Sequence, residues 1–379
     1  MRLMYQAPQY DVLYETPPLA THDTRPPFLE FFAGSGLVGH ALAPYFRVIW
    51  ANDVCPKKAA VFKANHEHTP FTLCSITDIN GTLLPSAVLS WASFPCQDLS
   101  LAGNGKGIRA KRSGLVWEWL RVMDEMPQRP NVLAAENVVG LVSTDGGIHY
   151  RELHAALTER GYKVGAMLLD AVHWLPQSRP RVFVVAVDDR MRIPEKLVDV
   201  KPNWAHSPVI QNTATGLDNW IWWRLPKPEK RQSTLSDIVD FSLPPQDEII
   251  SKKNLAMIPP AHMKRLEESG LSVVPGYKRM RSKKQVLELR FDNVAGCLRT
   301  PAGGSSRQYL VIRHGMEWRT RILSPREAAR LMGAPETFKL PGTFNDGYKA
   351  MGDAVAAPVA SYLAKHLLSP LAAACYDLS

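Results

Sequence analysis

The stretch Phe28-Leu-Glu-Phe-Phe-Ala-Gly-Ser-Gly-Leu-Val-Gly39 decides the fold of this chain. Its first five residues are apolar except for Glu30 and predict a buried strand, and a helix is expected from about Gly36. Gly34, Gly36 and Gly39 have GxGxxG spacing, which allows a tight turn, close approach of a ligand and close packing of the helix. This spacing alone is a weak signal, so the surrounding pattern has to decide its meaning.

Short apolar runs alternate with longer amphipathic runs up to about residue 187. The strand patterns cover residues 48–51, 88–94, 131–135 and a closing pair at 164–169 and 181–187. The helix patterns begin at about residue 56 and cover residues 115–126 and 150–160, and two more cover 325–332 and 354–367. This alternation predicts an α/β protein with a doubly wound, mostly parallel sheet.

The positive charge of the chain is concentrated in one internal segment. Residues 201–313 hold 18 Lys and Arg against 10 Asp and Glu, which is +8 of the total formal charge of +9. Proline is frequent between residues 190 and 300, and the periodicity there is irregular. We therefore expect an inserted, loop-rich module that binds a polyanion. The Trp222-Trp223 pair is expected in the core of that module.

These patterns predict three segments: residues 1–189 form the first part of the large domain, 190–300 the inserted module, and 301–379 the return to the large domain. No apolar run approaches the length of a membrane-spanning helix, and no signal peptide is evident. Five scattered cysteines without a CxxC pair argue against a zinc site and a disulfide framework. We therefore expect no metal and a reducing cytoplasm.

Acidic residues follow two of the predicted strands. Asp53 comes 19 residues after Gly34, close to the spacing at which an acidic residue accepts the hydroxyls of a bound ribose. Asp78, in Ile76-Thr-Asp-Ile79, is expected beyond a third strand at the same edge of the sheet, and a second ligand contact is as good an interpretation as a helix N-cap or a turn.

Cys96 comes directly after the strand pattern at 88–94. A cysteine at such a position is more often a small buried hydrophobe than a nucleophile. Here it precedes the polar, glycine-rich stretch 103–114, whose Lys106 and Arg109 are available to phosphates and favour a thiolate.

Glu136 follows the strand at 131–135 and is a candidate acid, base or hydrogen-bond partner, with a loop-capping role as the alternative. Gln177, Arg179 and Arg181 alternate along an extended segment and share one face. They predict a clamp for a phosphate or a base, with a surface row of ion pairs as the alternative.

Eight blocks in one order carry a resemblance to a known family. They are Phe-Ala-Gly-Ser-Gly (32–36), Asn-Asp (52–53), Thr-Asp-Ile (77–79), Pro-Cys-Gln (95–97), Glu-Asn-Val (136–138), Gln-Ser-Arg-Pro-Arg (177–181), Ser-Pro-Arg-Glu-Ala-Ala-Arg-Leu-Met-Gly (324–333) and Gly-Asp-Ala-Val (352–355). This series closely resembles the DNA cytosine-5 methyltransferase family of the prokaryotic modification type, over about residues 28–187 and 299–368.

The resemblance implies a Rossmann-like fold that binds S-adenosylmethionine. The implied cofactor-binding residues are Phe32, Ala33, Gly34, Gly36, Asp53, Asp78, Ile79, Pro95, Leu115, Asp353 and Val355. The implied catalytic residues are Cys96 as nucleophile on C6 of the cytosine, Glu136 as hydrogen-bond partner and proton donor to N3, and Arg179 and Arg181 as contacts of the extruded nucleotide. The family usually has Asn where this chain has Asp353, which leaves the role of this residue open.

The inserted module corresponds to the target recognition domain of the family. The expected DNA contacts are Gln97, Ser100, Lys106, Arg109, Gln177, Lys278, Arg279, Arg281 and Arg299. The expected partner is double-stranded DNA, with a cognate restriction endonuclease acting on the same site, and the protein is expected to act as a monomer on the nucleoid of a prokaryote or phage. The alternatives are methylation of RNA such as tRNA, a catalytically silent DNA-binding regulator and a nicotinamide dehydrogenase.

Overall fold

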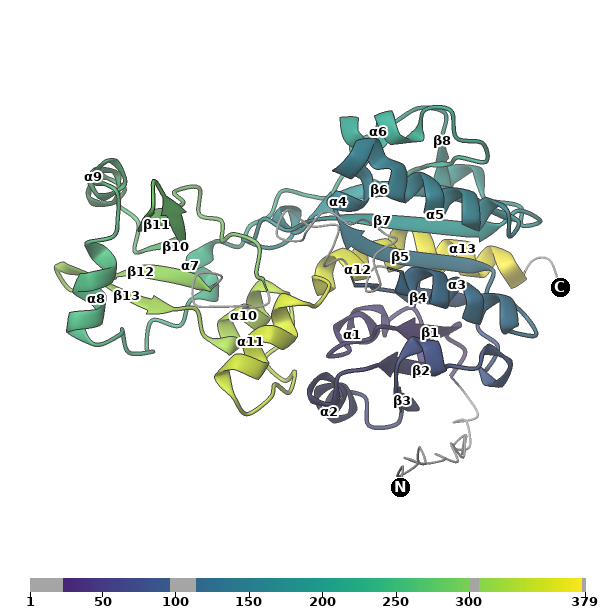
Figure 1. Ribbon diagram of the computed structural model, residues 1–379, viewed down its shortest axis with the longest axis horizontal. Coiled ribbons are helices and arrows are strands. Elements are labelled where there is room, and N and C mark those ends of the chain that lie inside the picture. Colours follow the sequence, from purple (N-terminus) through teal and green to yellow (C-terminus); the bar gives the residue numbers. More distant parts are fainter. Residues whose placement is uncertain (1–22, 96–113, 300–306, 377–379) are drawn as a thin grey trace, which may run out of the picture.

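A computed structural model describes residues 23–95, 114–299 and 307–376. The chain forms a large seven-stranded sheet and a smaller four-stranded sheet, which lie at opposite ends of an elongated molecule (Figure 1). The helices α10 (Pro325–Leu331) and α11 (Phe344–Gly352) lie between the two sheets (Figure 1).

The large sheet has the strand order β3-β2-β1-β4-β5-β7-β6, and all its strands except β7 run parallel. The bounds are β1 (Pro27–Phe31), β2 (Arg47–Asp53), β3 (Phe71–Leu73), β4 (Leu89–Ala92), β5 (Val132–Val138), β6 (Tyr162–Asp170) and β7 (Pro180–Asp188). The predicted mixed α/β fold with a mostly parallel sheet is confirmed. The carboxyl ends of the parallel strands carry the predicted site residues to one edge.

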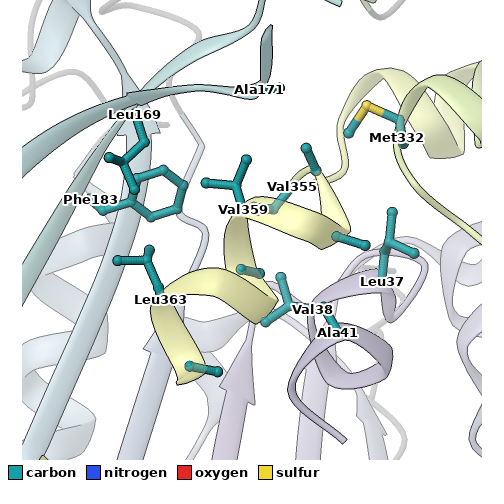
Figure 2. Packing of buried hydrophobic residues seen from close by; sticks show 14 of the residues in the cluster. Leu37, Val38, Ala41, Leu169, Ala171, Phe183, Met332, Val355, Val359 and Leu363 are labelled. Carbon is teal, nitrogen blue, oxygen red and sulfur yellow. The ribbon is translucent and has the colours of Figure 1, made fainter. Parts of the chain in front are cut away.

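Helices cover both faces of this sheet because its strands are apolar on both sides. Phe28 belongs to the core with α1 (Leu37–Leu42) and α12 (Ala357–Leu363), whereas its neighbour Leu29 faces the other core. That second core includes α3 (Leu115–Glu125) and α5 (Ile148–Thr158). Figure 2 shows Val359 and Leu363 of α12 packed between Phe183 of β7 and the helix α1. The carboxyl-terminal helices therefore complete the large domain.

The segment 195–225, which the sequence assigned to the inserted module, lies against the large domain instead. The N–H of Ile221 donates to the carbonyl of Val164 in β6, and the indole of Trp223 donates to the carbonyl of Val185. A Cβ at Gly165 would lie 2.2 Å from the Ile221 carbonyl, so glycine permits this close approach. Trp223 is fully buried in the large core rather than in the small module. Frequent proline predicted irregular backbone here, but it carries no information about which body the segment covers.

This segment contributes short elements to the edge beyond β6. They are β8 (Val198–Asp199), α6 (Pro208–Ala214) and β9 (Trp222–Trp223), and β8 pairs with β9. A further short helix of the large domain is α4 (Gly140–Ser143), and α13 (Ser369–Tyr376) follows α12 within the described residues.

The small domain is more regular than the sequence indicated. Its antiparallel sheet has the order β11-β10-β12-β13. The bounds are β10 (Val273–Arg281), β11 (Lys284–Leu289), β12 (Gln308–His314) and β13 (Glu317–Ile322), with α7 (Leu235–Ile238), α8 (Glu248–Leu255) and α9 (Pro260–Glu268) beside them. Because β12 and β13 pair in this sheet, the chain returns to the large domain after residue 322 rather than after residue 300. The mixture of charged and apolar residues along these strands concealed their alternation.

The helix α10 supports the small domain. Glu327 of α10 is buried and forms an ion pair with Arg321 of β13. The same carboxylate accepts from the N–H of Asp240, just after α7. Ser324 and Glu327 also form a capping box at the start of α10. One buried carboxylate therefore joins three parts of the chain at the junction of the two domains.

Candidate active site

The glycine-rich turn after β1 has two left-handed glycines with different reasons for being glycine. Gly36 has a φ of 81°, and a Cβ there would lie 2.7 Å from both Phe62, in the helix at residues 56–65, and His66, which follows that helix. Gly34 has a φ of 57°, but a Cβ there would meet no other atom closer than 3.9 Å. Gly36 is therefore needed for packing, whereas a Cβ at Gly34 would make only ordinary van der Waals contacts, and it is the left-handed backbone that favours glycine there.

Asp53 at the end of β2 fixes this turn. Its Oδ2 accepts from the N–H of Gly34 at 2.9 Å, and its Oδ1 accepts from the N–H of Cys55 at 2.8 Å. A carboxylate oxygen has two acceptor positions, so each oxygen can also accept from a hydroxyl. The arrangement fits the ribose of a nucleoside cofactor.

Asp78 lies in a single helical turn beyond β3 and is exposed. The side chain that caps this turn is Ser75, which accepts from the N–H of Thr77. This finding removes the interpretation of Asp78 as the N-cap. Arg121 of α3 donates to the carbonyls of Ile76 and Ile79 at 3.1 and 3.2 Å and holds the turn in place.

The carboxyl-terminal segment closes the cofactor side of the site. Asp353 follows α11, and its Oδ2 lies 2.6 Å from Nζ of Lys58. Lys58 belongs to α2 (Pro56–Asn65), the helix that follows Asp53, and the sequence analysis did not single it out. Val355 is buried, and Pro95 and Leu115 are half-buried. The chemistry of the glycine turn, the carboxylate of Asp53 and this ion pair fits the ribose and the charged end of S-adenosylmethionine.

Glu136 lies in β5 and is buried beside Arg181 of β7, with 3.0 Å between Oε1 of Glu136 and Nε of Arg181. Burial raises the pKa of Glu136, although the cations of Arg181 and Arg179 act in the opposite direction. A carboxyl group with a raised pKa keeps its proton at higher pH than usual and can donate it to a substrate. The expected loop-capping alternative does not apply, because Glu136 is part of the strand.

Asn137, the next residue, connects this acid to the neighbouring strand. Its Nδ2 donates to the carbonyl of Phe94 at 3.1 Å, just after β4 ends. The chain runs from Phe94 through Pro95 to Cys96, so this hydrogen bond ties the approach to the cysteine to the strand that carries Glu136. Cys96, Gln97, Ser100, Lys106 and Arg109 lie outside the described residues.

Arg179 is buried and bonded to the protein itself. Its guanidinium donates to the carbonyls of Leu298 at 2.9 Å, Gly352 at 3.0 Å and Ala354 at 2.7 Å. With 3% of its surface exposed, it does not present a surface to a nucleotide. The expectation of a direct nucleotide contact is thus corrected: Arg179 is a positioning residue that ties the segment after β11 to the segment around Asp353.

Gln177 is completely buried, which corrects the expectation of a DNA contact. Its amide donates to the carbonyl of Leu331 at 2.6 Å and accepts from the N–H of Leu298 at 3.1 Å. The face shared by Gln177 and Arg179 is therefore neither a phosphate clamp nor a surface row of ion pairs. It is a buried junction between the large sheet, α10 and the segment near residue 298.

Cys297 is a thiol near Arg179 and Arg181, and no spacing in the sequence pointed to it. Its Sγ lies 3.4 Å from Nη1 of Arg179 and 3.8 Å from Nη2 of Arg181. Burial opposes ionisation of the thiol, but the two arginines outweigh it and lower the pKa of Cys297. The two arginines therefore favour the thiolate form of Cys297.

A cleft of about 360 Å³ lies between the two domains. Its lining includes Pro180 from β7, Tyr277 and Arg279 from β10, and Arg290 and Arg299. Two of the predicted DNA contacts, Arg279 and Arg299, thus lie on the same cleft.

Two other predicted DNA contacts lie elsewhere on the β10–β11 hairpin. Lys278 places its Nζ 4.6 Å from the ring centre of Tyr309, and Arg281 forms an ion pair with Glu288 at 2.6 Å. Ser282 and Lys283 form the tight turn of this hairpin with positive φ angles. The basic run 278–284 is therefore a projecting hairpin rather than a loop.

The fold and the site together define a methyltransferase of the S-adenosylmethionine-dependent class. The sequence pattern of the C-5 cytosine-specific DNA methylase family matches residues 27–369, and the chain belongs to that family. The protein is a DNA cytosine-5 methyltransferase, and S-adenosylmethionine is its methyl donor.

Curated relatives agree with this assignment. The chain is 26% identical over 346 residues to the Type II methyltransferase M.Bsp6I of Bacillus sp. (strain RFL6), covering 89% of this chain and 97% of the relative. It is 24% identical over 353 residues to the Type II methyltransferase M.HhaI of Haemophilus parahaemolyticus, covering 91% and 94%.

Solved structures share the fold. The methyltransferase EhMeth of Entamoeba histolytica aligns with a TM-score of 0.61 at 15% identity, covering 94% of this chain and all of that chain. The Dnmt2 methyltransferase of S. pombe aligns with a TM-score of 0.59 at 18% identity, covering 94% and 99%.

Among the described residues, no cluster of His, Cys, Asp and Glu is suited to a metal ion. In the same ranges, no helix has the length and apolar character needed to cross a membrane.

Proposed function

We propose that Cys96 is the nucleophile and Glu136 the acid of a covalent methyl transfer to C5 of a cytosine in duplex DNA. The observation that carries this proposal is the buried pair of Glu136 and Arg181, joined through Asn137 to the segment that leads to Cys96. A buried acid of raised pKa, on the strand next to the one that leads to a cysteine, matches the chemistry that cytosine C5 requires.

The thiolate of Cys96 adds to C6 of the cytosine, while the carboxyl group of Glu136 donates its proton to N3. This addition makes C5 enamine-like, and the electron pair at C5 then forms the bond to the methyl group. A base removes the proton from C5, and the thiolate leaves from C6 to restore the double bond. Glu136 takes the proton back from N3, so that both residues return to their starting states.

S-adenosylmethionine, when bound, supplies an electrophilic methyl group: the bond between its sulfur and that methyl group breaks as the bond to C5 forms, and S-adenosylhomocysteine is the leaving group. The residues proposed to hold it are those of the turn at Phe32–Gly36, Asp53, Asp78 with Ile79, Pro95, Leu115, and Asp353 with Val355. In this proposal Asp53 accepts the ribose hydroxyls.

The target carbon is inaccessible inside a stacked duplex, so the cytosine must be extruded before it reaches Glu136. We place the target recognition domain at about residues 234–322, because segment 195–225 packs on the large domain and β12 and β13 belong to the small sheet. Arg279 and Arg299 on the cleft are its proposed DNA contacts, with Lys278 and Arg281 on the hairpin. Lys and Arg near phosphates supply affinity, and contacts to base edges supply sequence choice.

Two alternatives differ in observable ways. An RNA methyltransferase of the same chemistry would modify tRNA rather than duplex DNA. A silent DNA-binding regulator would bind DNA without transferring a methyl group, and the buried acid Glu136 argues against it. The Type II relatives favour duplex DNA and suggest that a restriction endonuclease shares the site. The proposal includes a monomer that acts on nucleoid DNA in the cytoplasm of a prokaryote or phage host.

Bisulfite sequencing of DNA from a host without cytosine-5 methylation, after expression of the protein, tests this function. Protected cytosines should appear within one short recurring sequence. Their absence, with methyl incorporation found in tRNA instead, would establish the RNA alternative.

A further inference from the structure

The ion pair of Lys58 and Asp353 lies directly beside the glycine turn of the cofactor site. Nζ of Lys58 is 2.6 Å from Oδ2 of Asp353, and Cδ of Lys58 is 3.9 Å from the position that a Cβ at Gly34 would take. The two side chains are 24% and 34% exposed, so neither is closed off from the space at the turn.

Both partners are held on rigid parts of the chain. Lys58 lies in the first turn of α2, directly after Asp53 has been fixed by two backbone N–H groups. Asp353 stands between Gly352 and Ala354, whose carbonyls both accept from Arg179. The pair is therefore preorganised, which reduces the entropy lost when a ligand binds.

The charges of Lys58 and Asp353 beside the glycine turn are complementary to those of an amino acid. Asp53 already accepts from two N–H groups and occupies the ribose position, which leaves Lys58 as a cation and Asp353 as an anion beside the turn. Burial opposes the charge of Lys58, but the carboxylates of Asp353 and Asp53 outweigh it, so the pKa of Lys58 is raised and the side chain stays charged. The methionine end of S-adenosylmethionine carries one carboxylate and one ammonium.

From this geometry we infer that Lys58 and Asp353 form the subsite for the amino-acid end of the cofactor, with Lys58 binding the carboxylate and Asp353 the ammonium. The inference rests on the proposed cofactor site and adds a residue to it. It also gives a reason for the departure at residue 353: an aspartate replaces the usual asparagine where a lysine stands across from it.

The competing explanation is that the pair only fastens α2 to the carboxyl-terminal segment. The same helix forms a purely structural ion pair of this kind through Lys57, whose Nζ lies 2.9 Å from Oδ1 of Asp346 and whose side chain is 70% exposed. Lys57→Met therefore removes a lysine and an ion pair from the same helix without touching the cofactor turn, and it is the matched control.

Calorimetric titration with three ligands separates the two explanations. S-adenosylhomocysteine has both the carboxylate and the ammonium, its decarboxylated analogue keeps only the ammonium, and 5′-methylthioadenosine has neither. Lys58→Met should bind S-adenosylhomocysteine about 10- to 100-fold more weakly, because a charge-assisted hydrogen bond is lost. Its affinity for the decarboxylated analogue should be unchanged or higher, and its affinity for 5′-methylthioadenosine should be unchanged.

Asp353→Asn should weaken binding of the decarboxylated analogue and leave 5′-methylthioadenosine unaffected. Lys58→Arg keeps the charge and should retain most of the affinity for S-adenosylhomocysteine, which keeps the test valid if Lys58→Met does not fold. Lys57→Met should bind all three ligands like the unaltered protein.

Equal weakening of all three ligands in Lys58→Met, or no weakening at all, would overturn the inference while leaving the methyltransferase assignment intact. Equal loss in Lys57→Met would overturn it as well. If the unaltered protein bound none of the three ligands, the proposed cofactor site would fail, and this inference would fail with it.

Discussion

Arg181 Nε lies 3.0 Å from Oε1 of Glu136, and this contact joins two strands that run in opposite directions. Arg181 is paired with Val138 in the register of β5 and β7, two residues beyond Glu136 on the same face of β5. The side chain therefore reaches Glu136 diagonally across the ladder. The antiparallel position of β7 next to β5 thus brings a cation to the acid on which the chemistry depends.

Glu136→Gln should lower kcat by about 10²- to 10⁴-fold, because the amide cannot donate a proton as an acid does. In the unaltered protein the protonated form of Glu136 is required, so the rate should fall as the pH rises through the raised pKa of this group. Initial rates measured upward from pH 4.5, the ordinary pKa of a glutamate, record this alkaline limb. Glu136→Gln should lack this alkaline fall in rate and still bind S-adenosylhomocysteine normally. If the fall in rate were unchanged in the variant, another group would be responsible for it.

Arg181→Met removes a cation that holds down the pKa of Glu136. The pKa of Glu136 should rise further, so the alkaline limb of the rate profile should move to higher pH, even though the rate itself falls. Arg181→Lys keeps the charge and should leave the limb close to its original position. A limb that stays in place in Arg181→Met would show that the two side chains are not coupled.

Arg179→Met should destabilise the fold, because three buried carbonyls lose their donor. Leaving buried groups unsatisfied should lower the free energy of unfolding by about 3 kcal/mol, measured by urea denaturation. Arg190→Met is the control, since Arg190 is an exposed residue just after β7 that forms an ion pair with nearby Asp188, and its replacement should change stability little. If Arg179→Met had normal stability but no longer bound DNA, the result would instead support the nucleotide contact expected from the sequence.

Glu30 should make stability depend on pH. It is buried in β1, and burial raises its pKa from 4.5 to about 8, partly opposed by the N–H of Gly39 and assisted by Asp53. The folded protein therefore keeps this proton while the unfolded chain releases it, so stability is lost as the pH rises from about 4.5 to about 8 and then levels off.

Glu30→Gln carries no such proton and should be the more stable protein at neutral pH, by about 3 kcal/mol at pH 7. Urea denaturation of both proteins at several pH values measures the difference between their slopes. Parallel pH profiles would contradict the buried, protonated state of Glu30.

Local periodicity was sufficient to predict most elements between residues 27 and 188, but not the ranges of the short elements β3 and α4, which have too few residues to show a period. The turn at Gly34 and the acid Glu136 were found for the same reason. The antiparallel strands β10 to β13 were missed because their pairing is non-local and their outer faces mix charged and apolar residues. Long-range contacts also decided the positions of Gln177 and Trp223.

The same limit applies to the site. The pair of Lys58 and Asp353 joins α2 to the end of α11, and the donors of Arg179 reach carbonyls near residues 298 and 353. A motif gives the order of residue types along the chain, but it does not show which atoms each side chain contacts in the fold. Arg179 and Arg181 belong to one motif, yet Arg179 is buried and donates to backbone carbonyls, whereas Arg181 forms an ion pair with Glu136.

The most direct test of the central claim is covalent trapping. A duplex that carries the methylated sequence, with 5-fluorocytosine at the target position, is incubated with the protein and S-adenosylmethionine. Fluorine at C5 cannot leave as a proton does, so the thiolate of Cys96 should remain bonded to C6. We predict a protein–DNA complex that survives denaturation, requires S-adenosylmethionine and is absent in Cys96→Ser. A protein that methylates the ordinary duplex but forms no such complex, or a Cys96→Ser variant that forms it equally well, would contradict the account.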